Sequence, residues 1–295
     1  MPTGYTTTDA LSDSLNDVVA AARAVREYEG KMSQLVERHT LEEGTGESWR
    51  EAVFAKLTAM PVTEQTVNEN YQQYSDSDWT ITPSMVQIAT LVTDKVARRI
   101  DKKAYARMGG LAQNAMQRLK DTDGLAILDG ATTSLGGAGT ALTTGLIAAA
   151  ATRISSNTTE PFMGAKRAVL HGYQIKDIYD ELTASLGTYA VPDGLTARVF
   201  TEGFRGKIAD TTIYEDGNIT IDGSDDAKGG VFAADAIVLI EGMSLKKETK
   251  REPGIGGGST VLYLTDEYSF GERLGANTTS VGVYEIYTDA TAPTS

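Results

Sequence analysis

One long stretch of helical periodicity, residues 94–130, constrains the fold of this chain more than any other feature. Its apolar residues recur at steps of three or four: Val96, Ile100, Ala104, Met108, Leu111, Ala115 and Leu119. This spacing predicts a helix with one buried stripe, about 35 Å long at about 1.5 Å per residue. Thr93 can cap its start and Gly130 can end it.

The same helix gathers the positive charge of an acidic protein. Residues 98–120 hold seven cations and one acid, whereas the whole chain has 40 acids, 27 bases and a formal net charge of -13. Beside Arg98, a cationic row of Arg99, Lys103 and Arg107 runs next to the apolar stripe. No helix-turn-helix spacing or aromatic stacking platform accompanies these cations. They indicate either a solvated face or a face that meets another protein.

Two adjacent glycines, Gly109 and Gly110, lie in the middle of this helix. Each glycine inside a helix costs about 1 kcal/mol relative to alanine. The pair therefore indicates a bend, a close contact or a flexible point.

Residues 62–92 predict a long β-hairpin that projects from the body. VTEQTVNENYQQ and WTITPSMVQIATLV flank the polar turn YSDSD, and Trp79 and Ile81 alternate in the second strand. The first strand has too little apolar material for a buried sheet of its own monomer. We expect such an arm to find its cover on another molecule.

The predicted hairpin is also acidic. It contains Glu64, Glu69, Asp76 and Asp78, and neither Lys nor Arg occurs between Pro61 and Asp94. Since opposite charges steer docking, we predict that copies of this chain associate. The four acids and Trp79 of one copy would then meet the cations Arg98, Arg99, Lys103 and Arg107 of the next.

The rest of the chain predicts a mixed α+β body. Before the hairpin, apolar spacing predicts one helix from Leu15 to Val36 and a second over 48–60. After the Gly-rich linker TSLGGAGT, helices near 143–155 and 173–182 alternate with strands such as RAVLHG and GKIADTTIY. TVLYLTDEYSF and TSVGVYEIY are expected to pair near the end.

No catalytic, cofactor or metal site is predicted. The chain has no cysteine, and its two histidines, His39 and His171, belong to no ligand motif. LGGAGTALTTG lacks the GKS or GKT ending of a phosphate loop, and DTDG and DGSDD lack the closing Glu of a calcium loop. The residues favour a protein that is not an enzyme, and no apolar run is long enough to cross a membrane.

The order of these parts resembles the major capsid protein of tailed bacteriophages, with the Hong Kong 97 fold. The resemblance lies in WTITPSMVQIATLVTD, the long helix closing in LAILDGA, and then MGAKRAVLHGYQIKDIYDEL, FRGKIADTTIYEDGNI and GGVFAADAIVLIEG. It implies an N-terminal arm with helices (1–61), an extended loop (62–92), a spine helix with peripheral domain (93–139), an axial domain (140–235) and return strands with a tail (236–295).

The resemblance also implies a function. Family members assemble through pentamers and hexamers into an icosahedral virion shell around double-stranded DNA, inside the bacterial host cytoplasm. Portal, scaffolding or decoration proteins are the expected partners, and Gly109 and Gly110 would be the spine-helix bend. Because residues 62–92 lack lysine, we expect a shell without covalent crosslinks. An encapsulin-like compartment shell, or a soluble α+β hydrolase or binding protein, are the alternatives.

Overall fold

The computed structural model describes residues 30–44, 46–64, 69, 71–99, 102–158, 160–184, 206–275 and 279–293. Within these ranges the side chains of 102–108, 182–184 and 275 are not described. The predicted helix from Leu15 therefore lies outside the described residues except for its last turn.

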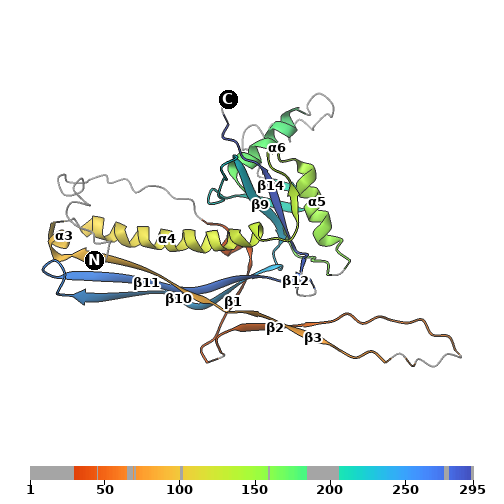
Figure 1. The fold of residues 1–295 in the computed structure, drawn as a ribbon, viewed down its shortest axis with the longest axis horizontal. Coiled ribbons are helices and arrows are strands. Elements are labelled where there is room, and N and C mark those ends of the chain that lie inside the picture. The colour runs from red at the N-terminus through yellow and green to blue at the C-terminus, as the bar shows by residue number, and fades with distance from the viewer. Residues whose placement is uncertain are drawn as a thin grey trace.

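Two lobes and one projecting hairpin make up the molecule (Figure 1). The helices and strands have the following bounds: α2 Met32–Leu35, β1 Glu37–Thr40, β2 Trp49–Phe54, β3 Asp76–Ile81, β4 Ser84–Thr93, α3 Asp94–Arg99, α4 Lys102–Asp129, β5 Ser134–Gly136, α5 Thr144–Ser155, β6 Lys166–Leu170, α6 Gly172–Ala184, β7 Lys207–Ile208, β8 Thr211–Glu215, β9 Asp226–Ala233, β10 Ile237–Glu252, β11 Ser259–Glu272, β12 Leu274–Gly275, β13 Thr279–Ser280 and β14 Val283–Asp289.

The elongated lobe is a long helix lying along a long sheet. Helix α4 runs beside a four-stranded sheet in the order β1-β10-β11-β4 (Figure 1). Strands β10 and β11 form its antiparallel centre, and β4 pairs antiparallel with β11. The prediction of a long helix over 94–130 is confirmed for the described residues, as α3 followed by α4.

The second lobe is a six-stranded sheet in the order β5-β14-β9-β6-β8-β7, with α5 and α6 packed beside it. Helix α5 begins where Thr143 accepts a hydrogen bond from the Leu146 amide, and it buries Ile147, Ala150 and Ile154. The predicted helices near 143–155 and 173–182 are confirmed. Strands β11 and β14, however, lie in different sheets, so the expected pairing between TVLYLTDEYSF and TSVGVYEIY is wrong.

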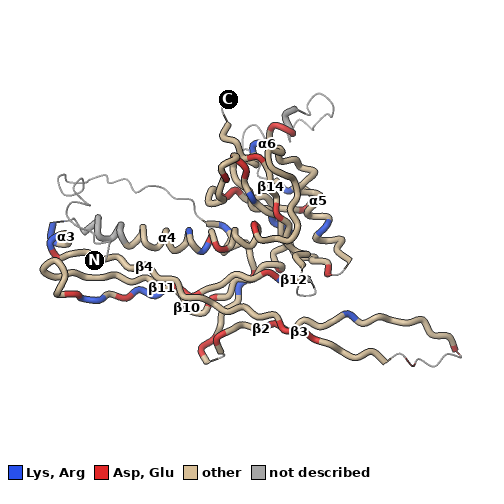
Figure 2. Tube along the Cα trace, viewed as in Figure 1, with Lys and Arg blue, Asp and Glu red and all other residues tan. Residues whose placement is uncertain are grey.

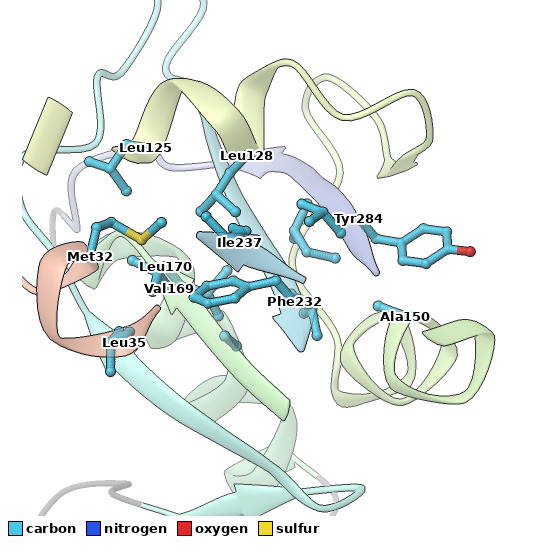
Figure 3. Close-up of a cluster of buried hydrophobic side chains, with 14 of the residues drawn as sticks. Met32, Leu35, Leu125, Leu128, Ala150, Val169, Leu170, Phe232, Ile237 and Tyr284 are labelled. Carbon is cyan, nitrogen blue, oxygen red and sulfur yellow. The ribbon is translucent and has the colours of Figure 1, made fainter. Parts of the chain in front are cut away.

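The main core joins the two lobes. Met32 and Leu35 of α2 pack with Leu125 and Leu128 of α4 against buried side chains of β6, β9, β10 and β14 (Figure 3). Gly230 in β9 allows this approach, because a Cβ there would lie 3.1 Å from the Leu128 side chain. The end of α4 is therefore the point at which long helix, long sheet and second lobe share one core.

The buried face of α4 differs from the predicted stripe. Leu111 and Leu119 are 42% and 40% exposed, whereas Ala112, Met116, Asp121 and Leu125 are buried. The sequence pattern missed this rotation because polar residues occupy part of the buried face. One of them is Lys120, whose Nζ lies 2.6 Å from Glu241 Oε1 and 4.8 Å from the Tyr268 ring centroid on the long sheet.

Two buried carboxyl groups, Asp121 of α4 and Asp216 just after β8, bind the backbone at the start of α2. Asp121 accepts hydrogen bonds from the Met32 amide (3.0 Å) and from Asn218 Nδ2 (2.9 Å). Asp216 accepts from the Lys31 amide at 3.3 Å. Burial, and then the neighbouring Asp121, raise the pKa of Asp216 to about 6.

The second predicted helix, over 48–60, is wrong. Trp49–Phe54 is strand β2, which pairs antiparallel with β3 from Trp49↔Ile81 to Phe54↔Asp76. The residues Trp49, Val53 and Leu57 fit helical spacing, but Trp49, Glu51 and Val53 also alternate as one face of a strand, and pairing with β3 decides between them. Ser48 bonds Thr82 Oγ1 at 2.7 Å instead of capping a helix.

The bounds expected for the hairpin are wrong for the same reason. Its strands are β2 and β3, so it spans about 49–81, and the described part of 62–73 contains no strand. The stretch WTITPSMVQIATLV is split at Thr82 and Pro83: β3 belongs to the hairpin, whereas β4 belongs to the long sheet. Of the return strands expected over 236–295, β10 and β11 lie in the long sheet, whereas β14 lies in the six-stranded sheet.

We predict that Glu272→Gln stabilises the protein at pH 8 but not at pH 4.5. Burial raises the pKa of Glu272 to about 7, and a smaller opposing effect comes from the Ser280 hydroxyl, which donates to Oε2 at 3.0 Å. The contribution of protonated Glu272 to the free energy of unfolding is therefore complete below pH 4.5, the ordinary pKa of the group. It is lost as pH rises through about 7.

The expected gain at pH 8 is on the order of 1 kcal/mol after screening by solvent. Urea unfolding at both pH values measures it. An equal effect of the substitution at pH 4.5 and pH 8 would contradict the prediction.

Candidate subunit interface

The hairpin exposes apolar side chains that the described part of its own chain leaves uncovered. Beyond β2 and β3, the Ala55 amide donates to Ser75 O, and Thr58 and Gln72 bond each other, so the two arms stay together. Exposed fractions from 49% to 91% are found at Phe54, Leu57, Met60, Val62, Tyr71 and Tyr74. Apolar surface gathered in this way marks a site of interaction.

Aromatic rings hold the root of the hairpin to the long sheet. Trp49 and Trp79 meet edge to face with centroids 5.7 Å apart, and His39 of β1 stacks on Trp49 at 5.0 Å. Ile81 packs with Val238 and Ile240 of β10. Gly271 makes room for this cluster, since a Cβ there would lie 2.4 Å from Ile81 Cδ1.

A group of three charges, Glu37, Glu51 and Arg273, completes the root and is called the root clasp below. Arg273 lies 2.5 Å from Glu37 Oε2 on β1 and 2.9 Å from Glu51 Oε2 on β2. It also donates to Asp235 O at 2.5 Å and lies 6.0 Å from the Trp79 ring centroid. One guanidinium therefore ties the hairpin to the long sheet and to the turn before β10.

The pKa shifts agree with this geometry. The hydrogen bond from Arg273 holds the pKa of Glu37 below its ordinary value, although burial opposes the shift. Burial alone would lower the pKa of Arg273, but its hydrogen bonds to Glu37 and Glu51 outweigh that effect and raise it. Glu37 and Arg273 therefore stabilise each other's charged form.

The predicted acidic residues lie on the exposed hairpin. Glu64, Glu69, Asp76 and Asp78 are exposed, and none of them forms an ion pair with another described residue. The hairpin is less acidic than expected, because its corrected bounds add two bases, Arg50 and Lys56, and one acid, Glu51. Because the hairpin contains Lys56, the absence of lysine no longer supports the expectation of a shell without covalent crosslinks.

The predicted cations divide into two sets. Arg98 and Arg99 are exposed on α3, at the end of the elongated lobe opposite the hairpin tip (Figure 2). Lys103 and Arg107 belong to α4, but their side chains lie outside the described residues. Since the hairpin acids and the α3 cations lie at opposite ends, they can meet only between two copies of the chain.

The sequence analysis missed further cations beside α3. The outer half of β10 is exposed and carries Lys246, Lys247, Lys250 and Arg251. Arg251 Nη1 lies 2.5 Å from Asp94 Oδ1 at the start of α3, while Lys246 and Lys250 pair with glutamates of their own strand. β1 pairs with β10 only from Val238 to Glu241, so the outer half of β10 is a sheet edge. The charged run LKKETKRE is typical of such an edge and could have indicated this basic surface from the sequence.

Trp79 and the glycine pair are placed differently from the charged residues predicted with them. Trp79 packs inside its own chain at the hairpin root, so we no longer count it among the contact residues. Gly109 and Gly110 lie within the continuous helix α4, and no atom would lie within 4 Å of a Cβ at either position. Close packing within the described part of the chain is therefore not the reason for the glycine pair.

The described residues hold no group of three or more His, Cys, Asp or Glu side chains that could bind a metal ion. His39 pairs with Glu37, and His171 Nδ1 accepts a hydrogen bond from the Tyr173 amide at 3.2 Å. None of the described helices combines the length and apolar character needed to span a membrane.

We predict that Arg273→Ala loosens the hairpin root. It would leave Glu37 and Glu51, whose side chains are 35% and 34% exposed, without their shared cation. The expected loss is about 2 kcal/mol in unfolding free energy, with faster hydrogen exchange in β2 and β3. Lys247→Ala, on exposed β10, is the matched control. Unchanged exchange in β2 and β3 after Arg273→Ala would show that the clasp does not hold the hairpin.

Comparison with known proteins gives a structural match without a sequence match. Neither a protein-family model nor a curated protein matches the chain. The head structure of Helicobacter pylori bacteriophage KHP40 has a TM-score of 0.72 at 13% identity, covering 99% of both chains. The capsid of Ralstonia phage GP4 has a TM-score of 0.69 at 15% identity, covering 95% of this chain and 96% of that chain.

A protein compartment shows the same similarity at a lower score. The holo-SrpI encapsulin complex from Synechococcus elongatus PCC 7942 has a TM-score of 0.61 at 11% identity, covering 99% of both chains. Identities this low establish the arrangement of the chain and nothing finer. The expected α+β class and the resemblance in fold are thereby confirmed: this chain has the Hong Kong 97 fold of tailed-phage capsid proteins.

Proposed function

We propose that this chain is a major capsid protein, which self-assembles through pentamers and hexamers into an icosahedral shell around the double-stranded DNA of a tailed phage. The observation that carries the proposal is the hairpin, which projects from its own subunit with six large apolar side chains exposed. An isolated subunit leaves this surface in water, whereas a neighbouring copy can bury it.

Charge supports the same arrangement of subunits. Glu64, Glu69, Asp76 and Asp78, which form no ion pair with another described residue, lie on the hairpin. The α3 cations lie at the far end of the elongated lobe (Figure 2). A head-to-tail contact between these two surfaces is heterologous, and such contacts close into rings when the rotation between subunits permits. Many weak contacts of this kind give a durable shell.

The acidity of the chain suits a container for DNA. With a net charge of -13, most of the surface repels phosphate, so packed DNA is not held on the wall. Cations used at subunit contacts do not interfere with that role. The fold shared with capsid proteins supports a structural role in a shell. We propose that the chain has no catalytic activity, lies in the virion capsid and assembles in the bacterial cytoplasm.

The domain assignment follows with corrected bounds. The extended loop is about 49–81, α3 and α4 form the spine helix, and the long sheet is the peripheral domain. The second lobe, including β14, is the axial domain. Residues 1–29 of the expected N-terminal arm lie outside the described residues. Other copies of the chain are the main partners, with portal and scaffolding or decoration proteins beside them.

An encapsulin-like compartment is the second candidate, because one structural neighbour over the full length is an encapsulin complex. Such a shell would hold protein instead of a genome. Nothing in the described residues favours the hydrolase or binding-protein alternative.

The first test is microscopy of the purified full-length protein. We expect closed particles tens of nanometres wide, because each subunit carries complementary surfaces at its two ends. Nucleic acid extracted from particles made during infection indicates a capsid, whereas protein cargo without nucleic acid indicates a compartment. A protein that remains monomeric at high concentration would overturn both readings.

The second test is a charge exchange between Asp78 and Arg99. We expect Asp78→Lys and Arg99→Glu each to reduce assembly, since each places like charges together, and the double variant to recover it. Light scattering during assembly measures the effect. Arg153→Glu, an exposed cation on α5, is the control. Equal assembly of all variants would mean that these two surfaces do not meet.

The third test concerns Gly109 and Gly110 as the bend of the spine helix. Replacing both with Ala stabilises the helical conformation of α4 by up to about 2 kcal/mol and so makes a bend there more costly. We expect particles that still assemble but fail to expand. Asn114→Ala, exposed on the same helix, is the control, and particle diameter before and after expansion is the measurement. Normal expansion of the double variant would remove the glycine pair from this role.

A further inference from the structure

His39 lies against both strands that meet at the hairpin root. Its Nε2 lies 2.8 Å from Glu37 Oε1 on β1, and its ring stacks on Trp49, the first residue of β2, with an interplanar angle of 21°. The Glu37 carboxylate thus has one oxygen on His39 and the other on Arg273. One imidazole therefore contacts the root clasp and the aromatic cluster together.

Charge balance at the root depends on this imidazole. The root clasp contains two carboxylates and one guanidinium, so one negative charge is left over when His39 is neutral. A protonated His39 balances that charge and donates to Glu37. A cationic ring also interacts more strongly with the face of Trp49 than a neutral one does.

The other charged groups on the elements packed at the root are already engaged or face away. Arg38 donates to Ser33 O at 2.5 Å, and Glu241 pairs with Lys120 at 2.6 Å. Asp235 accepts from Arg273 through its backbone carbonyl, whereas its carboxylate lies beside Gly164, where a Cβ would be 2.4 Å from Oδ1. Arg50 and Asp78 lie on the exposed face of the hairpin, opposite the face of Glu51. His39 is therefore the group at the root whose charge can change the balance of the clasp.

We propose that His39 is a proton-sensitive positioning residue for the hairpin: its protonation tightens the root clasp, and its deprotonation loosens the hairpin at its root. The proposal concerns the root itself and holds whether or not the chain forms shells.

Histidine is the side chain that ordinarily changes charge between pH 5 and 8. Across this range Glu37 stays ionised, since Arg273 holds its pKa below the ordinary value. Asp216 and Glu272 also titrate here, with pKa values of about 6 and about 7. Their carboxyl groups have other partners: Asp216 accepts from the Lys31 amide, and Glu272, next to Arg273 in the chain, accepts from the Ser280 hydroxyl.

The test is hydrogen exchange of the β2 and β3 amides in the full-length protein at pH 5.5 and pH 8. Rates are expressed as protection factors, so that the intrinsic pH dependence of exchange cancels. We expect protection to fall about two- to fivefold from pH 5.5 to pH 8, the range of one exposed ion pair. Amides of β9 and β14, in the other lobe, serve as the internal reference.

Three variants separate His39 from the other titrating groups. His39→Gln should show low protection at both pH values, because it cannot be charged. His39→Arg should show high protection at both, because arginine stays charged and can stack on Trp49. Glu272→Gln should keep the wild-type response. A wild-type response in His39→Arg or His39→Gln, or no response in the wild type, overturns the proposal.

Discussion

The position of the hairpin relative to the long sheet depends on the ion pairs and hydrogen bonds of Arg273. Beyond its root the described part of the hairpin is largely exposed, and Lys56 Nζ donates to Thr158 O at 3.5 Å. Its direction is therefore set mainly by contacts between β2, β3 and the long sheet. Arg273 joins Glu37, Glu51 and the turn before β10, and the stacked rings of His39, Trp49 and Trp79 fill the space beside it. A partly buried guanidinium with two carboxylates fixes geometry through direction as well as charge.

The two ends of the elongated lobe have different chemistry. The hairpin carries exposed apolar side chains together with acids, while α3 and the outer half of β10 carry exposed cations (Figure 2). Buried apolar surface would supply the free energy of association, and the charges would supply orientation and rate. Such a subunit leaves both surfaces exposed to water when it is alone, and assembly into the proposed shell would bury them.

Between these ends, polar groups inside the structure keep the parts in register. Lys120 joins α4 to the long sheet. Asp121 and Asp216 accept hydrogen bonds from the Met32 and Lys31 amides and so hold the start of α2. Buried charges cost free energy unless they are paired. Such groups specify one arrangement of the two lobes where apolar packing alone would allow several.

The sequence by itself determined the long helix, the α+β body, the projecting arm and the separation of acids from cations. Each of these is local: it depends on apolar spacing or on charge within one segment. It could not determine that Trp49–Phe54 is a strand, because Trp49, Val53 and Leu57 fit a helix and a strand equally well until β3 supplies hydrogen-bond partners.

Only the tertiary structure decided which face of α4 is buried, since Lys120 and Asp121 are tolerated there through partners more than ninety residues away. The same holds for the root clasp. Arg273, between β11 and β12, is 222 residues from Glu51 and 236 from Glu37, so no local pattern reports that it meets the carboxylates of β1 and β2.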